Sequence, residues 1–122
     1  MLLRFEMSEV SGIPVIAFEG DLDAVSVDEF EAAVLETAQG ADNCVIVDLT
    51  GVTYMDSQSF GRLLRAHVFL EREGGDLAIV TGHGNLVRTI NTFGADYLLS
   101  VREDREEAAG CLLPLISTER AF

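Results

Sequence analysis

The chain contains no lysine, and all eight of its basic residues are arginines. A nucleotide-binding P-loop requires the pattern GxxxxGK[ST], so this absence excludes it. A receiver domain of the response-regulator kind would need a lysine near its end and paired acids after its first strand, and the sequence has neither. Nucleotide binding by a P-loop and phosphorylation of a receiver domain are therefore both excluded.

Long apolar runs and paired cysteine motifs are also missing. The apolar runs are too short to cross a membrane, and the N-terminal segment MLLRFEMSEV lacks the apolar core of a secretion signal. We therefore expect a cytoplasmic protein without membrane insertion. The two cysteines, Cys44 and Cys111, lie far apart and show no metal-type spacing. We expect both to be reduced thiols in the core, and we expect no metal site.

Positive charge is scarce, with 21 acidic residues against 8 basic ones and a net charge of −13. Such a charge repels the phosphates of nucleic acids and the anionic surface of membranes. It attracts a basic protein partner. The length of 122 residues and the 48% of hydrophobic residues are typical of one folded domain. Binding to another protein is therefore favoured over direct nucleic-acid binding.

The apolar pattern predicts alternating strands and helices. Residues 2–7 and 13–20 read as two strands of a hairpin, joined by the Ser-Gly pair at 11–12. Ser26, with Glu29 three residues later, predicts a capping box at the start of the first helix. Further strands are predicted at 43–49, 76–81 and 97–101, and helices at 26–39, from 57 to about 74, at 85–94 and at 102–113.

This order of elements predicts an α/β fold in a single domain. The sheet is expected to be mostly parallel, with about five strands, an antiparallel N-terminal edge strand and about four helices. We assign residues 1–113 to the domain and leave 114–122 as a C-terminal tail without a predicted element.

The stretch VDLTGVTYMDSQSFGRLLRA, residues 47–66, contains the most informative polar pair. An apolar strand is expected to end at Asp48, and Asp56 and Ser57 stand where the next helix begins. Either residue could cap that helix by accepting a backbone N–H. The same place lies at the carboxyl end of a strand, where sites of α/β proteins gather, and a helix N-terminus tolerates a phosphate. Ser57 can therefore be a cap, a phosphorylation site, or both.

Enzymatic interpretations of Ser57 find little support. A hydrolase triad would need a histidine near Ser57. His67 lies ten residues along the same helix, roughly 15 Å away at 1.5 Å per residue, which is too far. His83 could approach the serine, but no GxSxG elbow surrounds Ser57. The pair Gly82 and Gly84 lacks the third glycine of a dinucleotide fingerprint. We expect no catalytic residues and no cofactor. A small-anion site at the helix starts Ser57 and Asn85 remains an alternative.

Four segments in order resemble the STAS-domain family, in particular the stand-alone bacterial anti-sigma factor antagonists. The segment FEGDLDAVSVDEFEAAV resembles the family's G-[ED]-L-D-x-x-[ST] pattern, with Gly20, Leu22 and Asp23 matching. The segment VIVDLTGVTYMDSQSFGRLL resembles D-L-[ST]-x-[VL]-x-[FY]-[ILM]-D-S-[SA]-G-[LF]-G. EREGGDLAIV matches the G-G-x-[LV] strand entry, and LVRTINTFGADYLLSV resembles the R-x-[LF]-x-x-x-G helix and last strand. The resemblance covers about residues 3 to 112.

The resemblance implies a protein that switches partners and is not an enzyme. In the family, the serine after the aspartate, here Ser57, is phosphorylated by an anti-sigma factor that is also a serine kinase. The unphosphorylated form binds that kinase and frees a sigma factor, phosphorylation ends the complex, and a serine phosphatase restores it. The partner-binding residues expected on this chain are Asp23, Asp56, Ser57, Gln58, Ser59 and Arg62.

Two positions depart from the family's pattern. Gln58 stands where a small residue is usual, and Ser59 replaces the first glycine and is a second candidate acceptor. The alternative function is a STAS scaffold, or a subunit of a signalling or membrane-transport complex, without a phosphorylation switch. The identities of the sigma factor and the kinase, and the oligomeric state, are left open by the sequence.

Overall fold

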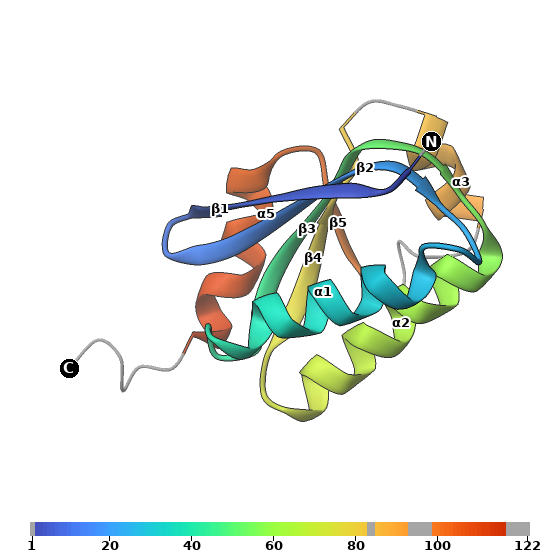
Figure 1. Cartoon of the computed structure of the whole chain (residues 1–122). Coiled ribbons are helices and arrows are strands. Elements are labelled where there is room, and N and C mark those ends of the chain that lie inside the picture. The colour runs from blue at the N-terminus through green and yellow to red at the C-terminus, as the bar shows by residue number, and fades with distance from the viewer. Residues whose placement is uncertain (1, 83–84, 93–98, 117–122) are drawn as a thin grey trace.

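The computed structural model describes residues 2–82, 85–92 and 99–116, and it confirms the expected α/β fold (Figure 1). One sheet has the strand order β1-β2-β3-β4-β5, with β1 antiparallel to β2 and the other neighbours parallel. The strands are β1 (Arg4–Val10), β2 (Ile13–Leu22), β3 (Cys44–Met55), β4 (Asp76–Val80) and β5 (Ser100–Arg102). The helices are α1 (Val27–Gln39), α2 (Ser57–Arg72), α3 (Asn85–Thr92) and α5 (Arg105–Leu112), followed by a 3₁₀ turn, Leu113–Leu115.

Several expected features fall on residues that are not described. They are the end of the third helix at 93–94, the start of the last strand at 97–98, His83, and residues 117–122 of the tail. The other predicted elements are present, with ends that differ by a few residues, except for β3.

The sheet separates two apolar cores. On one face, side chains of α1, α2 and α3 pack against Val45, Val47, Leu77 and Ile79 of the central strands. On the other face, α5 covers a smaller cluster that includes Ile46 and Ala78. Because the central strands are apolar on both sides, 43–49 and 76–81 read as continuous apolar runs in the sequence. Figure 1 shows α1 and α2 side by side on one face and α5 on the other.

Strand β3 is longer than the sequence predicted. It does not end at Asp48 but continues to Met55, and among the described strands its last part pairs with β2 alone, up to the partners Leu22 and Met55. Pairing between β3 and β4 stops at Asp48. The two paired strands therefore extend beyond the rest of the sheet and carry the start of α2 with them.

The predicted capping box at Ser26 is wrong. The Ser26 side chain makes no cap bond to α1; its hydroxyl instead donates to the carbonyl of Asp21 at 2.8 Å. The carboxylate of Asp23 accepts the backbone N–H groups of Val25 at 3.0 Å and Ser26 at 3.3 Å. In a capping box the Glu29 side chain would accept the backbone N–H of Ser26, and here the carboxylate of Asp23 accepts that N–H instead.

Two glycines stand where the chain leaves no room for a side chain. A Cβ on Gly75 would lie 2.0 Å from the carbonyl oxygen of Asn43, at the entry to β4. Gly20 has a φ of +116°, and a Cβ there would lie 2.4 Å from the carbonyl oxygen of Leu2. Both positions therefore require glycine for close packing of neighbouring backbones.

Both cysteines are free thiols, as expected. Cys44 is buried, and burial raises the pKa of its thiol, while Cys111 is half-buried on α5. In the described part of the chain, no helix is long and apolar enough to cross a membrane.

Candidate functional site

The predicted pair Asp56 and Ser57 lies at the exposed end of the β2–β3 extension. Asp56 is the N-cap of α2, and its carboxylate accepts the backbone N–H of Ser59 at 2.7 Å. The backbone N–H of Asp56 donates to the carbonyl of Leu22 at 3.1 Å, which fixes the start of the helix to the end of β2. Ser57 is the first residue of α2 and is exposed. The cap is thus Asp56, and Ser57 is an exposed residue beside it.

Asp23, an expected partner-binding residue, lies in the loop next to this helix start. It directly follows Leu22, the residue whose carbonyl binds Asp56. Its carboxylate organises the turn before α1, and the residue is half-buried. Asp23 therefore shapes the loop beside Ser57, and at least part of its surface is accessible to a partner.

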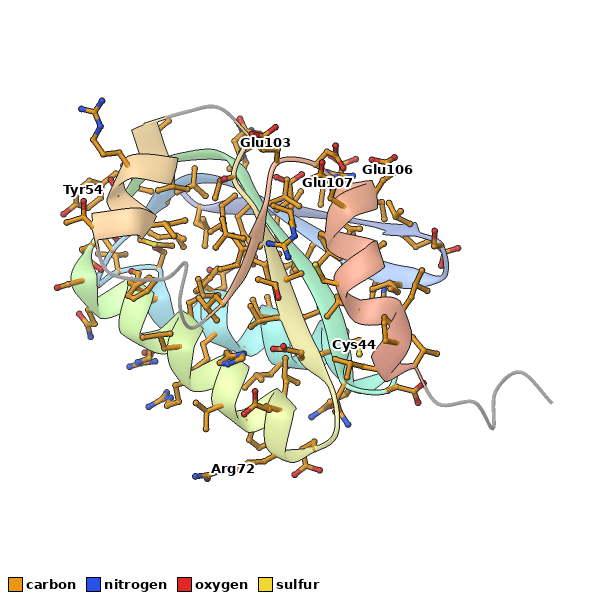
Figure 2. The ribbon with its side chains drawn as sticks, turned by 180° about the vertical axis from the view of Figure 1, so that it is seen from behind. Cys44, Tyr54, Arg72, Glu103, Glu106 and Glu107 are labelled. Carbon is orange, nitrogen blue, oxygen red and sulfur yellow. The ribbon has the colours of Figure 1, made fainter. Side chains whose placement is uncertain are left out.

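Two exposed apolar side chains border the same region and were missed by sequence reasoning. Val25, in the loop after β2, is 91% exposed, and Tyr54, near the end of β3, is 54% exposed. Figure 2 shows Tyr54 at the end of the sheet where α2 begins. The sequence did contain a signal, because Val25 stands two positions after Asp23 and Tyr54 two positions before Asp56. Singly exposed apolar side chains are common on protein surfaces, so these two matter only through their place beside Asp23 and Asp56 in the sequence.

Ser59 does not belong to this surface. Its side chain is fully buried, and among the described residues its hydroxyl has no hydrogen-bond partner. The expectations that it contacts a partner or competes as a phosphate acceptor therefore do not fit the structure, because the helix turns it inward. Gln58, by contrast, is exposed next to Ser57.

Arg62 is already engaged within the chain. Its guanidinium lies 2.7 Å from Asp28 and 3.3 Å from Glu31, both on α1, and its side chain is 25% exposed. Arg65 binds the same Glu31 through both carboxylate oxygens. The Arg65 hydrogen bond is the main cause that lowers the pKa of Glu31 below its ordinary value. These arginines join α1 to α2, and Arg62 keeps a limited exposed surface near the helix start.

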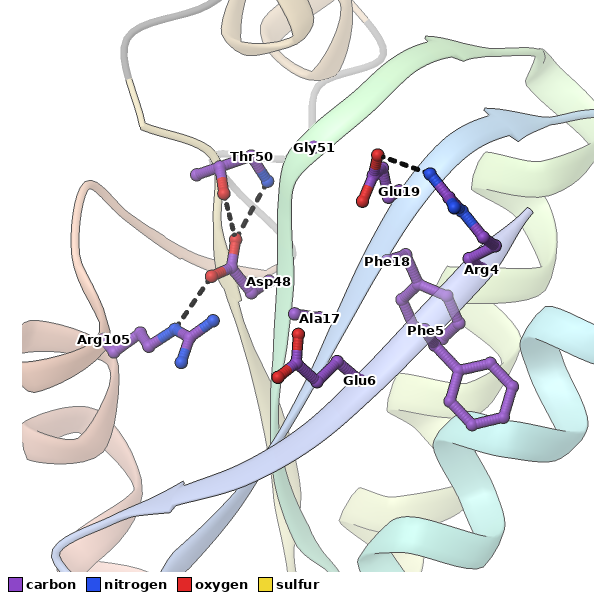
Figure 3. Close-up of a pocket in the computed structure, with 10 residues that line it drawn as sticks. All are labelled: Arg4, Phe5, Glu6, Ala17, Phe18, Glu19, Asp48, Thr50, Gly51 and Arg105. Carbon is purple, nitrogen blue, oxygen red and sulfur yellow. Dashed lines mark hydrogen bonds and ion pairs between the residues drawn. The ribbon is translucent and has the colours of Figure 1, made fainter. Parts of the chain in front are cut away.

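A second polar group lies on the sheet face that α5 covers in part (Figure 3). Asp48 is 5% exposed, and its carboxylate binds Arg105 at 2.8 Å and the hydroxyl of Thr50 at 2.7 Å. An open cavity of about 460 Å³ lies between this group and the pair Arg4–Glu19. Among the charged side chains that line it, Arg105 pairs with Asp48 and Arg4 pairs with Glu19, which indicates structural ion pairs, one of them at the start of α5.

One group of side chains in the described residues could offer metal ligands. His67, Glu71 and Asp76 place their donor atoms within 4.8 Å of one another, at the end of α2 opposite to Ser57. The ring nitrogen Nδ1 of His67 lies 2.6 Å from Asp76. This contact joins α2 to the start of β4, which is a sufficient structural role for the histidine.

Solved structures share this fold. An anti-sigma factor antagonist from Mycobacterium paratuberculosis matches with a TM-score of 0.79 and 18% identity, covering 91% of this chain and 94% of its own. The Bacillus cell fate determinant SpoIIAA, in its phosphorylated form, matches with a TM-score of 0.62 and 23% identity, covering 88% and 97%. The murine anion transporter Slc26a9 matches with a TM-score of 0.69 and 17% identity, covering 84% of this chain and 18% of the transporter.

A search of curated proteins finds no match. The family model described as the STAS domain matches residues 4–108, which include all five strands and the start of α2 with Asp56 and Ser57. Because this match spans most of the chain, the chain belongs to the STAS domain family.

Proposed function

We propose that this protein is an anti-sigma factor antagonist that acts in the cytoplasm. Unphosphorylated, it binds a cognate anti-sigma factor that is also a serine kinase, and it thereby frees a sigma factor. Phosphorylation of Ser57 ends the complex, and a serine phosphatase restores it. The observation that carries the proposal is the exposed Ser57 at the first position of α2, beside the capping Asp56. The protein is a binding partner and a substrate in this scheme, not an enzyme.

The similarity to structures named as anti-sigma factor antagonists supports this role, and one of them, SpoIIAA, has been solved in a phosphorylated form. Their identities to this chain are below 25%, so the likeness itself concerns the fold. The argument for the site therefore comes from the residues around Ser57.

The environment of Ser57 suits a charge-operated switch. A phosphate adds close to two negative charges, next to the carboxylate of Asp56 and on a chain whose net charge is already −13. The N-terminus of α2 tolerates the added charge within the protein. A partner surface packed over the same position would have to desolvate that charge. A penalty of about 4 kcal/mol would weaken the complex nearly a thousandfold.

The proposed contact surface consists of the loop 23–26 and the residues around the start of α2. Asp23, Asp56 and Gln58 supply polar contacts, and the exposed part of Arg62 lies at the border. Val25 and Tyr54 supply apolar contacts. Ser59 is buried and Ser57 is exposed, so the proposal names Ser57 as the acceptor, although Gln58 beside it is larger than the residue usual in the family's pattern.

The test is to incubate the purified protein with ATP and candidate anti-sigma kinases and to locate phosphate by mass spectrometry. Ser57→Ala should bind the kinase constitutively, and Ser57→Asp should bind poorly. Ser11→Asp, which adds the same charge at an exposed turn far along the sheet, is the matched control and should bind like the original. Equal binding of all these variants would contradict the proposal.

The alternative, a scaffold or a transporter-associated STAS module, is favoured by the shared fold with part of Slc26a9. It predicts stable co-purification with other partners and no phosphate on Ser57. The mass spectrum of the protein isolated from its own cells distinguishes the two functions.

A further inference from the structure

We propose that β1 is a self-association edge, through which two copies of this chain pair antiparallel into one continuous sheet. β1 is the outermost strand in the order β1-β2-β3-β4-β5, so among the described strands its outer backbone edge has no neighbour. The strand is seven residues long, contains neither proline nor glycine, and is exposed at the first six of its positions. A long edge strand without proline, whose outer N–H and C=O groups have no strand partner among the described residues, can pair with another strand.

The two faces of β1 differ in chemistry. Phe5 and Met7 point to the α1 side, where they are 45% and 56% exposed and border a shallow apolar groove against α1. Arg4 and Glu6 point to the α5 side, and Figure 3 shows Phe5 and Glu6 leaving the strand in opposite directions. The strand therefore presents an apolar row on one face and alternating charges on the other.

These rows are self-complementary in one register. With a two-fold axis at Phe5, this ring lies opposite the partner's Phe5, and Met7 lies opposite the partner's Leu3. On the other face, Arg4 lies opposite the partner's Glu6, and the symmetry makes that pair twice. Apolar pairs and opposite charges in directly facing positions both stabilise an antiparallel ladder.

The neighbouring registers are unfavourable. A two-fold axis at Arg4 places this arginine opposite the partner's Arg4. An axis at Glu6 places the two Glu6 carboxylates opposite each other. An axis at Met7 places Phe5 opposite the partner's Glu9. Because like charges that face each other destabilise a sheet, charge selects the register centred on Phe5. The inference rests on β1 alone and is independent of the function proposed for Ser57.

The test is sedimentation velocity over a range of concentrations. The unmodified protein should form a dimer as concentration rises, and Arg4→Glu, which places two acids opposite each other twice, should weaken that dimer about tenfold or more. The double variant Arg4→Glu, Glu6→Arg reverses both charges and should restore it. Arg72→Glu, with the same charge change at the exposed end of α2, is the matched control and should dimerise like the original (Figure 2).

The double variant also separates the dimer from a contact within the chain. Arg4 pairs with Glu19 at 2.9 Å, and this pair is broken in both Arg4 variants. If the double variant recovers the dimer affinity and the single variant does not, the difference reports the contact between copies. Circular dichroism confirms that each variant is folded. A protein that stays monomeric at all concentrations, an equal effect of Arg4→Glu and Arg72→Glu, or no recovery in the double variant would each overturn the proposal.

Discussion

The carboxylate of Asp56 accepts the backbone N–H of Ser59 at 2.7 Å, across the first turn of α2. One residue therefore holds the start of the helix and also stands directly beside the exposed Ser57. The hydrogen bond fixes the backbone on both sides of the proposed acceptor, so its position does not depend on a flexible loop.

Asp56→Ala should lower the free energy of unfolding by about 1 kcal/mol, because α2 loses its N-cap. Asp56→Asn keeps the acceptor oxygen and should lose much less. Urea denaturation followed by circular dichroism measures both. Equal stability of the alanine variant and the original would show that the cap contributes nothing.

Ser59→Ala should raise the free energy of unfolding by about 1 kcal/mol. The hydroxyl of Ser59 is fully buried without a partner among the described residues, and an unsatisfied buried polar group costs about 1 to 3 kcal/mol. Ser57→Ala, at an exposed position of the same helix turn, should stay within about 0.5 kcal/mol of the original. A loss of stability in Ser59→Ala would indicate that this hydroxyl has a partner in solution, such as a bound water.

Glu31→Gln should lower stability at pH 7 by about 1 kcal/mol, because the bonds to Arg62 and Arg65 lose their charge. The pKa of Glu31 is lowered from 4.5, mainly by the Arg65 hydrogen bond. Its stabilisation is therefore complete above about pH 5 and is lost as the pH falls through the lowered pKa.

The difference between Glu31→Gln and the original should accordingly close in acid, as measured by urea denaturation at several pH values. Glu29→Gln, at an exposed position of the same helix, is the control with the same charge change. A difference that stays constant down to pH 3 would mean that packing, not charge, is responsible.

Gly75→Ala should destabilise the fold by about 3 kcal/mol, since the new methyl group would lie 2.0 Å from the carbonyl of Asn43. Gly110→Ala is the matched control, because a Cβ there meets nothing within 4 Å and the residue lies within α5. That variant should gain up to about 1 kcal/mol from helix propensity. Thermal unfolding should move in opposite directions for the two variants.

Val25→Asp should weaken binding to the anti-sigma factor by about tenfold or more, because it removes an exposed apolar contact and adds a charge to the proposed surface. Tyr54→Ala should act in the same direction. Val68→Asp, which alters an apolar side chain 43% exposed near the other end of α2, is the control. Isothermal titration calorimetry with the purified partner measures all three, and equal affinities would exclude this surface.

The central strands, the hairpin and the helix stripes were predictable because each depends on a short local pattern. Val45 and Val47 are buried on a strand that reads as apolar throughout, and Phe30 and Val34 follow the helical period. The start of α2 at Ser57 was also predictable, since an aspartate before a helical pattern is a common cap.

The features that were missed depend on distant contacts. Beyond Asp48, β3 has β2 as a neighbour but no pairing with β4, so its exposed Thr50 and Tyr54 break the apolar pattern although the strand continues. The pairing of Arg62 and Arg65 with Glu31 joins residues more than thirty positions apart. The burial of Ser59 follows from how α2 lies on the sheet, which a local pattern does not encode.

The extension of β2 and β3 past the remaining strands also bears on the speed of any modification at Ser57. Ser57 lies at the end of this extension and is already accessible to a kinase, so the native state would not have to open before the reaction. The modification rate would then follow the frequency of productive collisions and the chemistry on the enzyme. Mild denaturant should accordingly leave that rate unchanged or lower it, whereas an acceptor hidden in the interior would react faster as the protein loosens.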